Sequence, residues 1–314
     1  MRRIIVTPVT NGRRAALLCG YLKAQKAHFD EWHLWINTRD AEELRALSAL
    51  ASGAPWITTV SPDDSDPSGG KYNLPRFYRF CTEPDAAYAR VSEDVAWLSP
   101  DFVKALFEYR EAHPQLFLVH ANTVGNPALA YVHDRLGAVS SGMGRPRYDH
   151  ADPVANSPEF VRDLHAAFKK SVPDATADWT FAAWKLYDRE RVPLDAFSWL
   201  GQEFEQFRGR VALDEEPWLC TERPVSIGKH SAVCGRALCA KAEGQAEWEA
   251  YEALAPAPEP KPEPEPVPAP EPVPEPEPVP EPEQGTPPPA VPEVQATPPA
   301  PKKKRATRRS AVVT

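Results

Sequence analysis

A long proline-rich stretch limits how much of this chain can fold. Residues 256–301 hold 21 prolines and 9 glutamates among 46 residues, with few large apolar side chains. Such a segment cannot bury enough surface to offset the entropy lost on ordering, so it predicts a disordered linker. Residues 1–255 are long enough for one sizeable domain with a proper core. Residues 302–314 follow the linker as a short basic tail.

The net charge of the whole chain, −8, hides three unlike parts. The linker alone carries −8 and the basic tail +6, which leaves −6 for residues 1–255. A mildly acidic domain argues against a general nucleic-acid binder. The six cations of the tail either contact a polyanion or serve only as a solvated end.

Glu-Pro and Val-Pro pairs alternate through the linker, which is typical of polyproline II at about 3.1 Å per residue. A fully extended linker would reach on the order of 140 Å. In one interpretation it lets the tail tether the domain to DNA or another polyanion. In a second it keeps the domain clear of an assembly to which the tail attaches, and in a third it is an extension without function.

Neither a membrane span nor a signal peptide is expected. The sequence has no window of about 18 apolar residues, and the apolar run Ile4–Val6 is cut off by Thr7 and Pro8. The cysteines are odd in number, scattered and without a CxxC pair: Cys19, Cys81, Cys220, Cys234 and Cys239. This pattern predicts reduced thiols in a cytoplasmic protein.

Strand-like and helical patterns alternate along the first part of the chain. The predicted strands are residues 3–6, 32–36, 56–60, 88–91 and 116–119. The predicted helices are residues 13–26, 42–50 and 101–112. The alternation indicates parallel strands joined by right-handed crossovers, hence an α/β, Rossmann-like, mostly parallel sheet flanked by helices. Ligands bind such sheets at the carboxyl ends of the strands.

Ser92-Glu93-Asp94 is the most informative of the segments that follow a strand. Two carboxylates at the mouth of a site repel each other unless a divalent cation or bound water offsets the charge. The competing interpretation is a turn in which Asp94 caps the next helix.

Three signatures of nucleotide or acyl chemistry are missing. The sequence has no GxGxxG after the first strand, no GxxxxGK[ST] and no GxSxG, which argues against dinucleotide, P-loop and α/β-hydrolase sites. A nucleotide binder without a glycine-rich loop needs another way to hold a diphosphate. A metal ion held by acidic residues after a strand is one such way.

The order of several segments resembles the GT-A class of glycosyltransferases, and within it a bacteriophage and actinobacterial group. The segments that carry the resemblance are residues 4–9, 33–38, 73–78, 88–98, 199–204, 214–219 and 222–224. The likeness runs from about residue 3 to residue 240 and ends before the linker. It implies a nucleotide-diphosphate-sugar donor, transfer to a hydroxyl, and Mn²⁺ or Mg²⁺.

The resemblance also implies roles for single residues. Asp94 would be the metal ligand, and Asp214 and Glu215 the candidate general bases, ahead of Glu216. Those three acidic residues alternatively form a solvated turn before Trp218. The residues expected to contact the donor are Thr7, Pro8, Arg13, Asn37, Arg76 and Glu93.

The chain departs from the family pattern at two positions. Ser92 stands where an aspartate is usual, and Lys241 follows the last strand where a metal-binding histidine is expected. Each change removes a potential ligand. Either the ion is held weakly by Asp94, Glu93 and the diphosphate, or Lys241 replaces part of its charge, or the enzyme is impaired.

The first hypothesis is therefore a hexosyl- or pentosyltransferase acting on a hydroxyl of a protein, a glycan or modified DNA. A DNA acceptor requires a target base flipped out of the stack. The second hypothesis is a non-catalytic module of the same fold that binds a sugar nucleotide or glycan, and the third is another nucleotide-dependent α/β transferase. A phage-encoded protein would work in the cytoplasm of its host.

Overall fold

The computed structural model describes residues 1–61, 74–139, 142, 144–149, 151–172, 176–186, 194–205, 230–242 and 244–256. The predicted linker beyond Pro256, the basic tail, and the candidate bases Asp214 and Glu215 lie outside the described residues. Of the helices in the described part, none has the length and apolar character needed to cross a membrane.

Nine strands and eight α-helices make up the described part of the chain. The strands are β1 (Arg2–Val9), β2 (Glu31–Ile36), β3 (Ile57–Val60), β4 (Ala86–Val91), β5 (Val95–Leu98), β6 (Leu116–Val124), β7 (Trp184–Leu186), β8 (Ala196–Leu200) and β9 (His230–Lys241). The α-helices are α1 (Gly12–Ala24), α2 (Ala41–Ser52), α3 (Leu74–Phe77), α4 (Phe102–Ala112), α5 (Pro127–Arg135), α6 (Pro158–Ser171), α7 (Gly201–Glu205) and α9 (Gln245–Glu252). Short 3₁₀ turns cover Lys26–His28, Tyr78–Phe80 and Thr176–Trp179.

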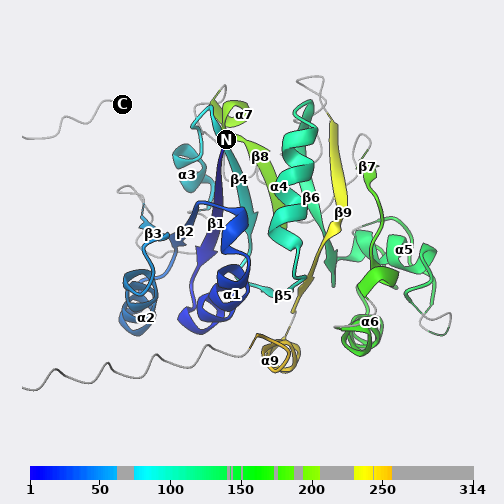
Figure 1. The fold of residues 1–314 in the computed structure, drawn as a ribbon. Coiled ribbons are helices and arrows are strands. Elements are labelled where there is room, and N and C mark those ends of the chain that lie inside the picture. The colour runs from blue at the N-terminus through cyan, green and yellow to red at the C-terminus, as the bar shows by residue number, and fades with distance from the viewer. Residues whose placement is uncertain are drawn as a thin grey trace, which may run out of the picture. The chain divides into compact units, whose positions relative to one another are not determined.

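All nine described strands belong to one sheet, in the order β3-β2-β1-β4-β8-β6-β9-β5, with β7 paired to β9 (Figure 1). The five predicted strands are confirmed as β1, β2, β3, β4 and β6, and all five run in the same direction. The mostly parallel α/β fold is thereby confirmed. Direct pairing of β4 with β6 does not occur, because β8 lies between them and runs antiparallel to both.

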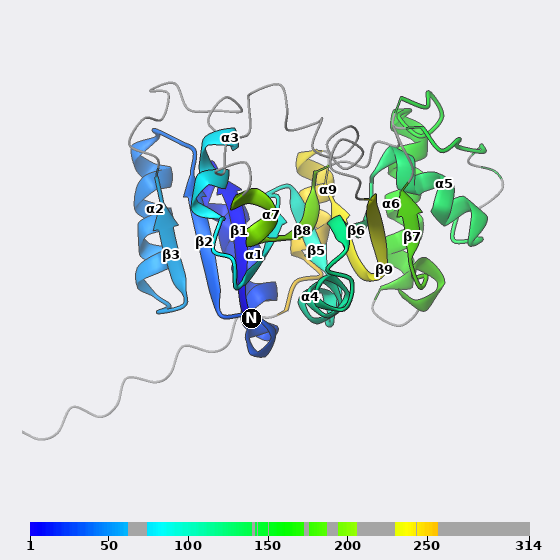
Figure 2. The ribbon, with the colours of Figure 1, turned by 90° about the horizontal axis from the view of Figure 1, so that it is seen from above.

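Helices cover both faces of the sheet, and each face has its own core. Ile5 packs into a large core with residues of α1, α2, α4, α6 and α9. Its neighbours Ile4 and Val6 point to the other face, into an aromatic core with residues of α3 and α7. Figure 2 shows α3 and α4 on opposite sides of the strands. A strand buried on both faces reads as a continuous apolar run, which is why β1 was recognisable.

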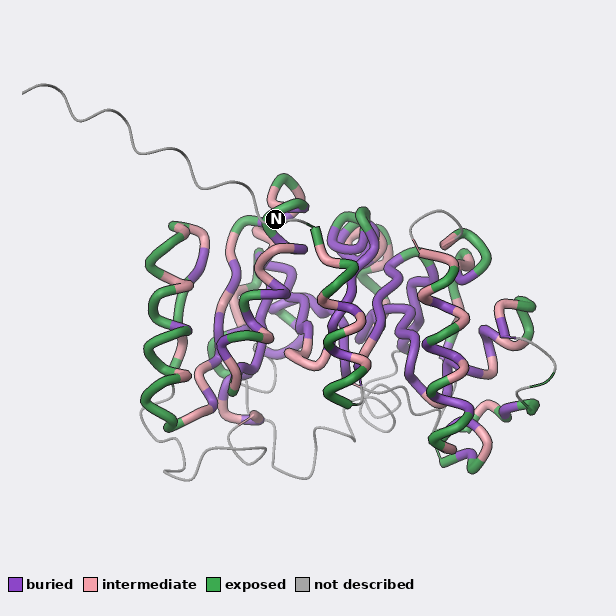
Figure 3. The backbone as a smooth tube through the Cα atoms, turned by 90° about the horizontal axis from the view of Figure 1, so that it is seen from below, coloured by how far each residue is buried: buried purple, intermediate pink, exposed green. Residues whose placement is uncertain are grey.

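Burial follows this layering. The central strands are buried along most of their length, while exposed residues gather on the helices (Figure 3). In α2 only Leu47 is fully buried. The helix begins after Asp40, whose carboxylate accepts hydrogen bonds from the backbone N–H groups of Glu42 and Glu43 at 2.8 and 3.0 Å.

Gly201, directly after β8, lies very close to the backbone of the segment before β4, and a mutation can test this contact. A Cβ at this position would lie 1.9 Å from the backbone carbonyl oxygen of Glu83, and no side-chain rotation can relieve a backbone clash. We expect Gly201→Ala to lower the free energy of unfolding by about 1–3 kcal/mol, measured by urea denaturation. The matched change Gly20→Ala places a methyl group in open space within α1 and should stabilise by about 0.5–1 kcal/mol. Equal stability of the two variants would contradict the close approach.

Candidate functional site

Two turns meet at the carboxyl ends of β1 and β4. The turn from β4 to β5 carries Glu93, and the turn from β1 to α1 contains Thr10 and Asn11. The Glu93 carboxylate accepts hydrogen bonds from the backbone N–H of Thr10 at 2.7 Å and of Asn11 at 3.1 Å, and also from the Thr10 hydroxyl. Both carboxylate oxygens of Glu93 are therefore engaged within the protein, where they hold the two turns together.

Asp94, the next residue, forms an ion pair with Arg14 in the first turn of α1. Its backbone carbonyl accepts a hydrogen bond from the N–H of Ala242, just beyond β9, at 3.0 Å. The cap of the following helix α4 is Asp101 and residues 95–98 form β5. The helix-capping interpretation of Asp94 is thus wrong.

A second ion pair comes from β8 and β9. The Lys241 ammonium lies 3.4 Å from a carboxylate oxygen of Asp195, and the backbone carbonyl of Asp195 accepts a hydrogen bond from the N–H of Ser92 at 2.7 Å. Asp195 is only 8% exposed. Burial raises the pKa of its carboxyl group, Lys241 opposes that rise, and the nearby charge of Asp94 adds to it. We call Arg14, Asp94, Asp195 and Lys241 the charge quartet.

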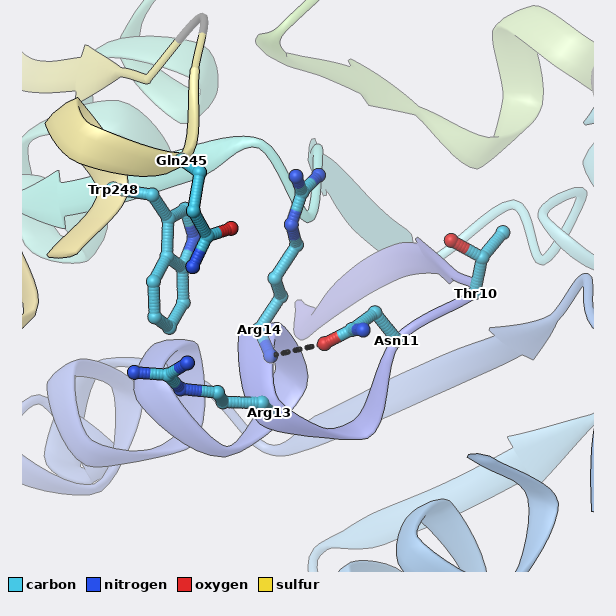
Figure 4. A pocket seen from close by; sticks show the side chains of 6 residues that line it. All are labelled: Thr10, Asn11, Arg13, Arg14, Gln245 and Trp248. Atoms are coloured by element: carbon cyan, nitrogen blue, oxygen red, sulfur yellow. Dashed lines mark hydrogen bonds between the residues drawn. The ribbon is translucent and has the colours of Figure 1, made fainter. Parts of the chain in front are cut away.

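A polar cavity of about 320 Å³ lies between the β1–α1 turn and α9 (Figure 4). Its lining residues are Thr10, Asn11, Arg13, Arg14, Gln245 and Trp248. Arg14 extends away from α1 past Gln245, and Arg13 runs beneath the Trp248 ring. The Arg13 guanidinium lies 5.1 Å from the centre of that ring and donates to Glu252 at 3.2 Å. Two arginines from consecutive positions thus face one cavity.

Four backbone N–H groups in the turn before α1 and at its start have acceptors in the protein. Besides the two held by Glu93, the N–H of Gly12 donates to Glu43 at 2.5 Å and that of Arg14 to the Asn11 side chain at 3.0 Å. The guanidinium groups of Arg13 and Arg14 are the cationic groups that line the cavity, and they could bind an anion there. A guanidinium carries five N–H donors and can contact a carboxylate and a phosphate together.

The other residues expected to contact a donor are placed as follows. Thr7 is fully buried and its hydroxyl accepts a hydrogen bond from the Trp32 indole at 2.8 Å, and Pro8 is buried beside it. Asn37 is 7% exposed, and its side-chain oxygen has no hydrogen-bond partner among the described residues. Arg76 lies on α3 and is half-buried. None of the four lines the cavity, and their ligand roles stay predictions.

A divalent ion requires several oxygen, nitrogen or sulfur ligands converging on one point. Within the part of the chain that the structure describes, no three or more His, Cys, Asp or Glu side chains form such a group. Asp94 is paired with Arg14, and the Ser92 hydroxyl accepts a hydrogen bond from the N–H of Asp94 at 3.4 Å. These residues do not fit a metal site.

Sequence reasoning missed four residues of this site: Arg14, Asp195, Gln245 and Trp248. Arg14 follows Arg13 directly in the first turn of a predicted helix, and this position could have indicated that it lies at the same edge of the sheet. Asp195 precedes β8, an antiparallel strand that is not among the five predicted strands. Gln245 and Trp248 lie beyond residue 240, where the family resemblance ends.

No protein-family model matches the chain, and no curated protein has a significantly similar sequence. Among solved structures, CMP:2-keto-3-deoxy-manno-octonic acid synthetase in complex with CTP is 12% identical, with a TM-score of 0.45 over 81% of this chain and 98% of that one. The mannosyltransferase PcManGT from Pyrobaculum calidifontis, in complex with GDP-Man and Mn²⁺, is 14% identical, with a TM-score of 0.47 over 80% of this chain. A mycobacterial protein is 13% identical, with a TM-score of 0.43 over 80% of this chain and 71% of that one.

The match spans 59% of the length of the mannosyltransferase.

Glu93 gives the site a measurable pH dependence. Burial raises the pKa of its carboxyl group, against the lowering effect of its hydrogen bonds from Thr10 and Asn11. Between the ordinary and the raised pKa the folded state binds more protons than the unfolded state, so the free energy of unfolding falls as pH rises through that window. We expect Glu93→Gln to flatten this fall, measured by urea unfolding across a pH series. The matched change Glu42→Gln, on the surface of α2, should keep the wild-type slope, and an unchanged slope in Glu93→Gln would contradict the assignment.

Proposed function

We propose that this chain is a nucleotide-sugar-dependent glycosyltransferase whose donor diphosphate binds in the polar cavity beside α1. The observation that carries the proposal is the pairing of Arg13 and Arg14 in one cavity at the carboxyl end of β1. Open α/β sheets bind ligands at that edge, and arginine is well suited to phosphate oxygens. A volume of about 320 Å³ falls within the range of small-molecule sites.

The family resemblance adds the reaction class. In sugar transfer the bond from the anomeric carbon to the diphosphate breaks, and a bond forms from that carbon to the acceptor oxygen. Negative charge grows on the leaving diphosphate, where guanidinium groups placed in advance would stabilise it. The acceptor hydroxyl loses its proton to a carboxylate, a role that the proposal gives to Asp214 or Glu215.

The acceptor is a hydroxyl of a protein, a glycan or modified DNA. We assign the reaction to the cytoplasm, because four of the cysteines are free thiols, three of them buried, as reducing conditions favour. The basic tail is proposed as the contact with a polyanion, since the domain itself is acidic.

Calorimetric titration of UDP-sugars and GDP-sugars tests the donor site. We expect Arg13→Gln to weaken binding by about 10-fold to 100-fold, because a charge-assisted hydrogen bond to phosphate is lost. The matched change Arg45→Gln, on the exposed face of α2, removes the same charge outside the cavity and should bind like the wild type. Equal affinity of the two variants would place the diphosphate elsewhere.

A measurement of turnover then distinguishes the glycosyltransferase from the alternative, a non-catalytic binding module. Release of nucleoside diphosphate from a labelled donor is the expected result, and Asp94→Ala should reduce it, because Arg14 then loses the ion pair that positions it in the cavity. Tight donor binding without any turnover would instead favour the binding module.

A further inference from the structure

We propose that Arg14 and Lys241 occupy the place of a divalent cation in this site, so that the anionic donor binds without metal. The inference rests on the proposed function and names the electrostatic partner of the donor. It starts from the charge quartet, in which the carboxylates of Asp94, between β4 and β5, and of Asp195, just before β8, are each paired with a basic side chain.

Backbone hydrogen bonds hold the quartet in place. The N–H of Ser92 donates to the carbonyl of Asp195 at 2.7 Å, and the N–H of Ala242 donates to that of Asp94 at 3.0 Å. Val95, next to Asp94, is the sheet partner of Lys241. Asp94, Asp195 and Lys241 therefore project from segments that are bonded to one another. Arg14 follows the turn that Glu93, next to Asp94, holds through the N–H groups of Thr10 and Asn11, so the proximity of all four is a property of the fold.

The charges balance within the quartet. Asp94 lies close enough to Asp195 for its charge to raise the pKa of the Asp195 carboxyl group. Two carboxylates so close together repel each other and destabilise the folded state unless cations offset their charge. A Mn²⁺ ion would supply two positive charges, and Arg14 and Lys241 together supply the same number.

Both basic side chains of the quartet are partly exposed. The side chains of Arg14 and Lys241 are 34% and 29% exposed, and Arg14 lines the cavity itself. An ammonium group carries three N–H donors and a guanidinium five, so each can contact its carboxylate and a phosphate oxygen together. A metal ion in the same place would have to displace both ion pairs.

Nucleoside diphosphate binding provides the first test. UDP and GDP are titrated into the full chain by calorimetry, once with EDTA and once with Mn²⁺. The affinity should be the same in both, and Lys241→Gln should weaken it by about 10-fold to 100-fold. Lys241→Arg keeps the charge and should retain binding in EDTA. Arg236→Gln removes an exposed charge from the same strand and should match the wild type. Binding that is lost in EDTA overturns the inference.

Mn²⁺ alone provides the second test, which needs no nucleotide. Mn²⁺ binding at this site is defined as the portion of the total Mn²⁺ binding that is lost when Asp94→Asn is introduced. Circular dichroism checks that each variant is folded. The wild type should show none, and the double variant Arg14→Gln, Lys241→Gln should gain it, because Asp94 and Asp195 have then lost the cations paired with them. Uptake by the wild type, or no uptake by the folded double variant, overturns the inference.

The two tests separate this inference from the proposed function. If UDP, GDP and their sugars all fail to bind, the proposed function is wrong, while the Mn²⁺ titration still decides whether Arg14 and Lys241 stand where a cation would bind.

Discussion

The candidate site depends on the hydrogen bonds that the carboxylate of Glu93 accepts. By accepting hydrogen bonds from Thr10 and Asn11, it joins the turn after β1 to the turn after β4. The turn after β1 leads into α1, which is capped by Asn11 and carries both arginines of the cavity. The same junction brings Arg14, in the first turn of α1, next to Asp94, the residue that follows Glu93. Burying a carboxylate is tolerated here because three donors satisfy it.

The antiparallel strand β8 makes the second contribution. It enters the sheet between β4 and β6, so residues near its start lie at the same edge as the ends of the parallel strands. Asp195 reaches the site in this way, from a segment about one hundred residues after Asp94 in the sequence. The parallel strand β9 ends beside it and supplies Lys241. The charge quartet is thus a product of strand order.

This arrangement changes how the two departures from the family pattern are understood. Ser92 and Lys241 each look like the loss of a metal ligand when taken singly. In the structure the Ser92 hydroxyl accepts a hydrogen bond within its turn and Lys241 pairs with Asp195. Together with Arg14 they leave the site with basic groups in contact with its carboxylates.

The sequence by itself determined the five parallel strands and the α/β class, because strands buried on both faces are continuous apolar runs whose period is local. It also predicted that Arg13, Glu93 and Asp94 lie near one edge of the sheet, since residues that follow parallel strands share that edge; their roles in binding stay predictions. Only the tertiary structure decided that Glu93 holds two turns together, and that Asp195, Trp248 and Lys241 join the site. Those contacts link residues far apart in the chain, and their distances depend on strand order and direction, which no local pattern encodes.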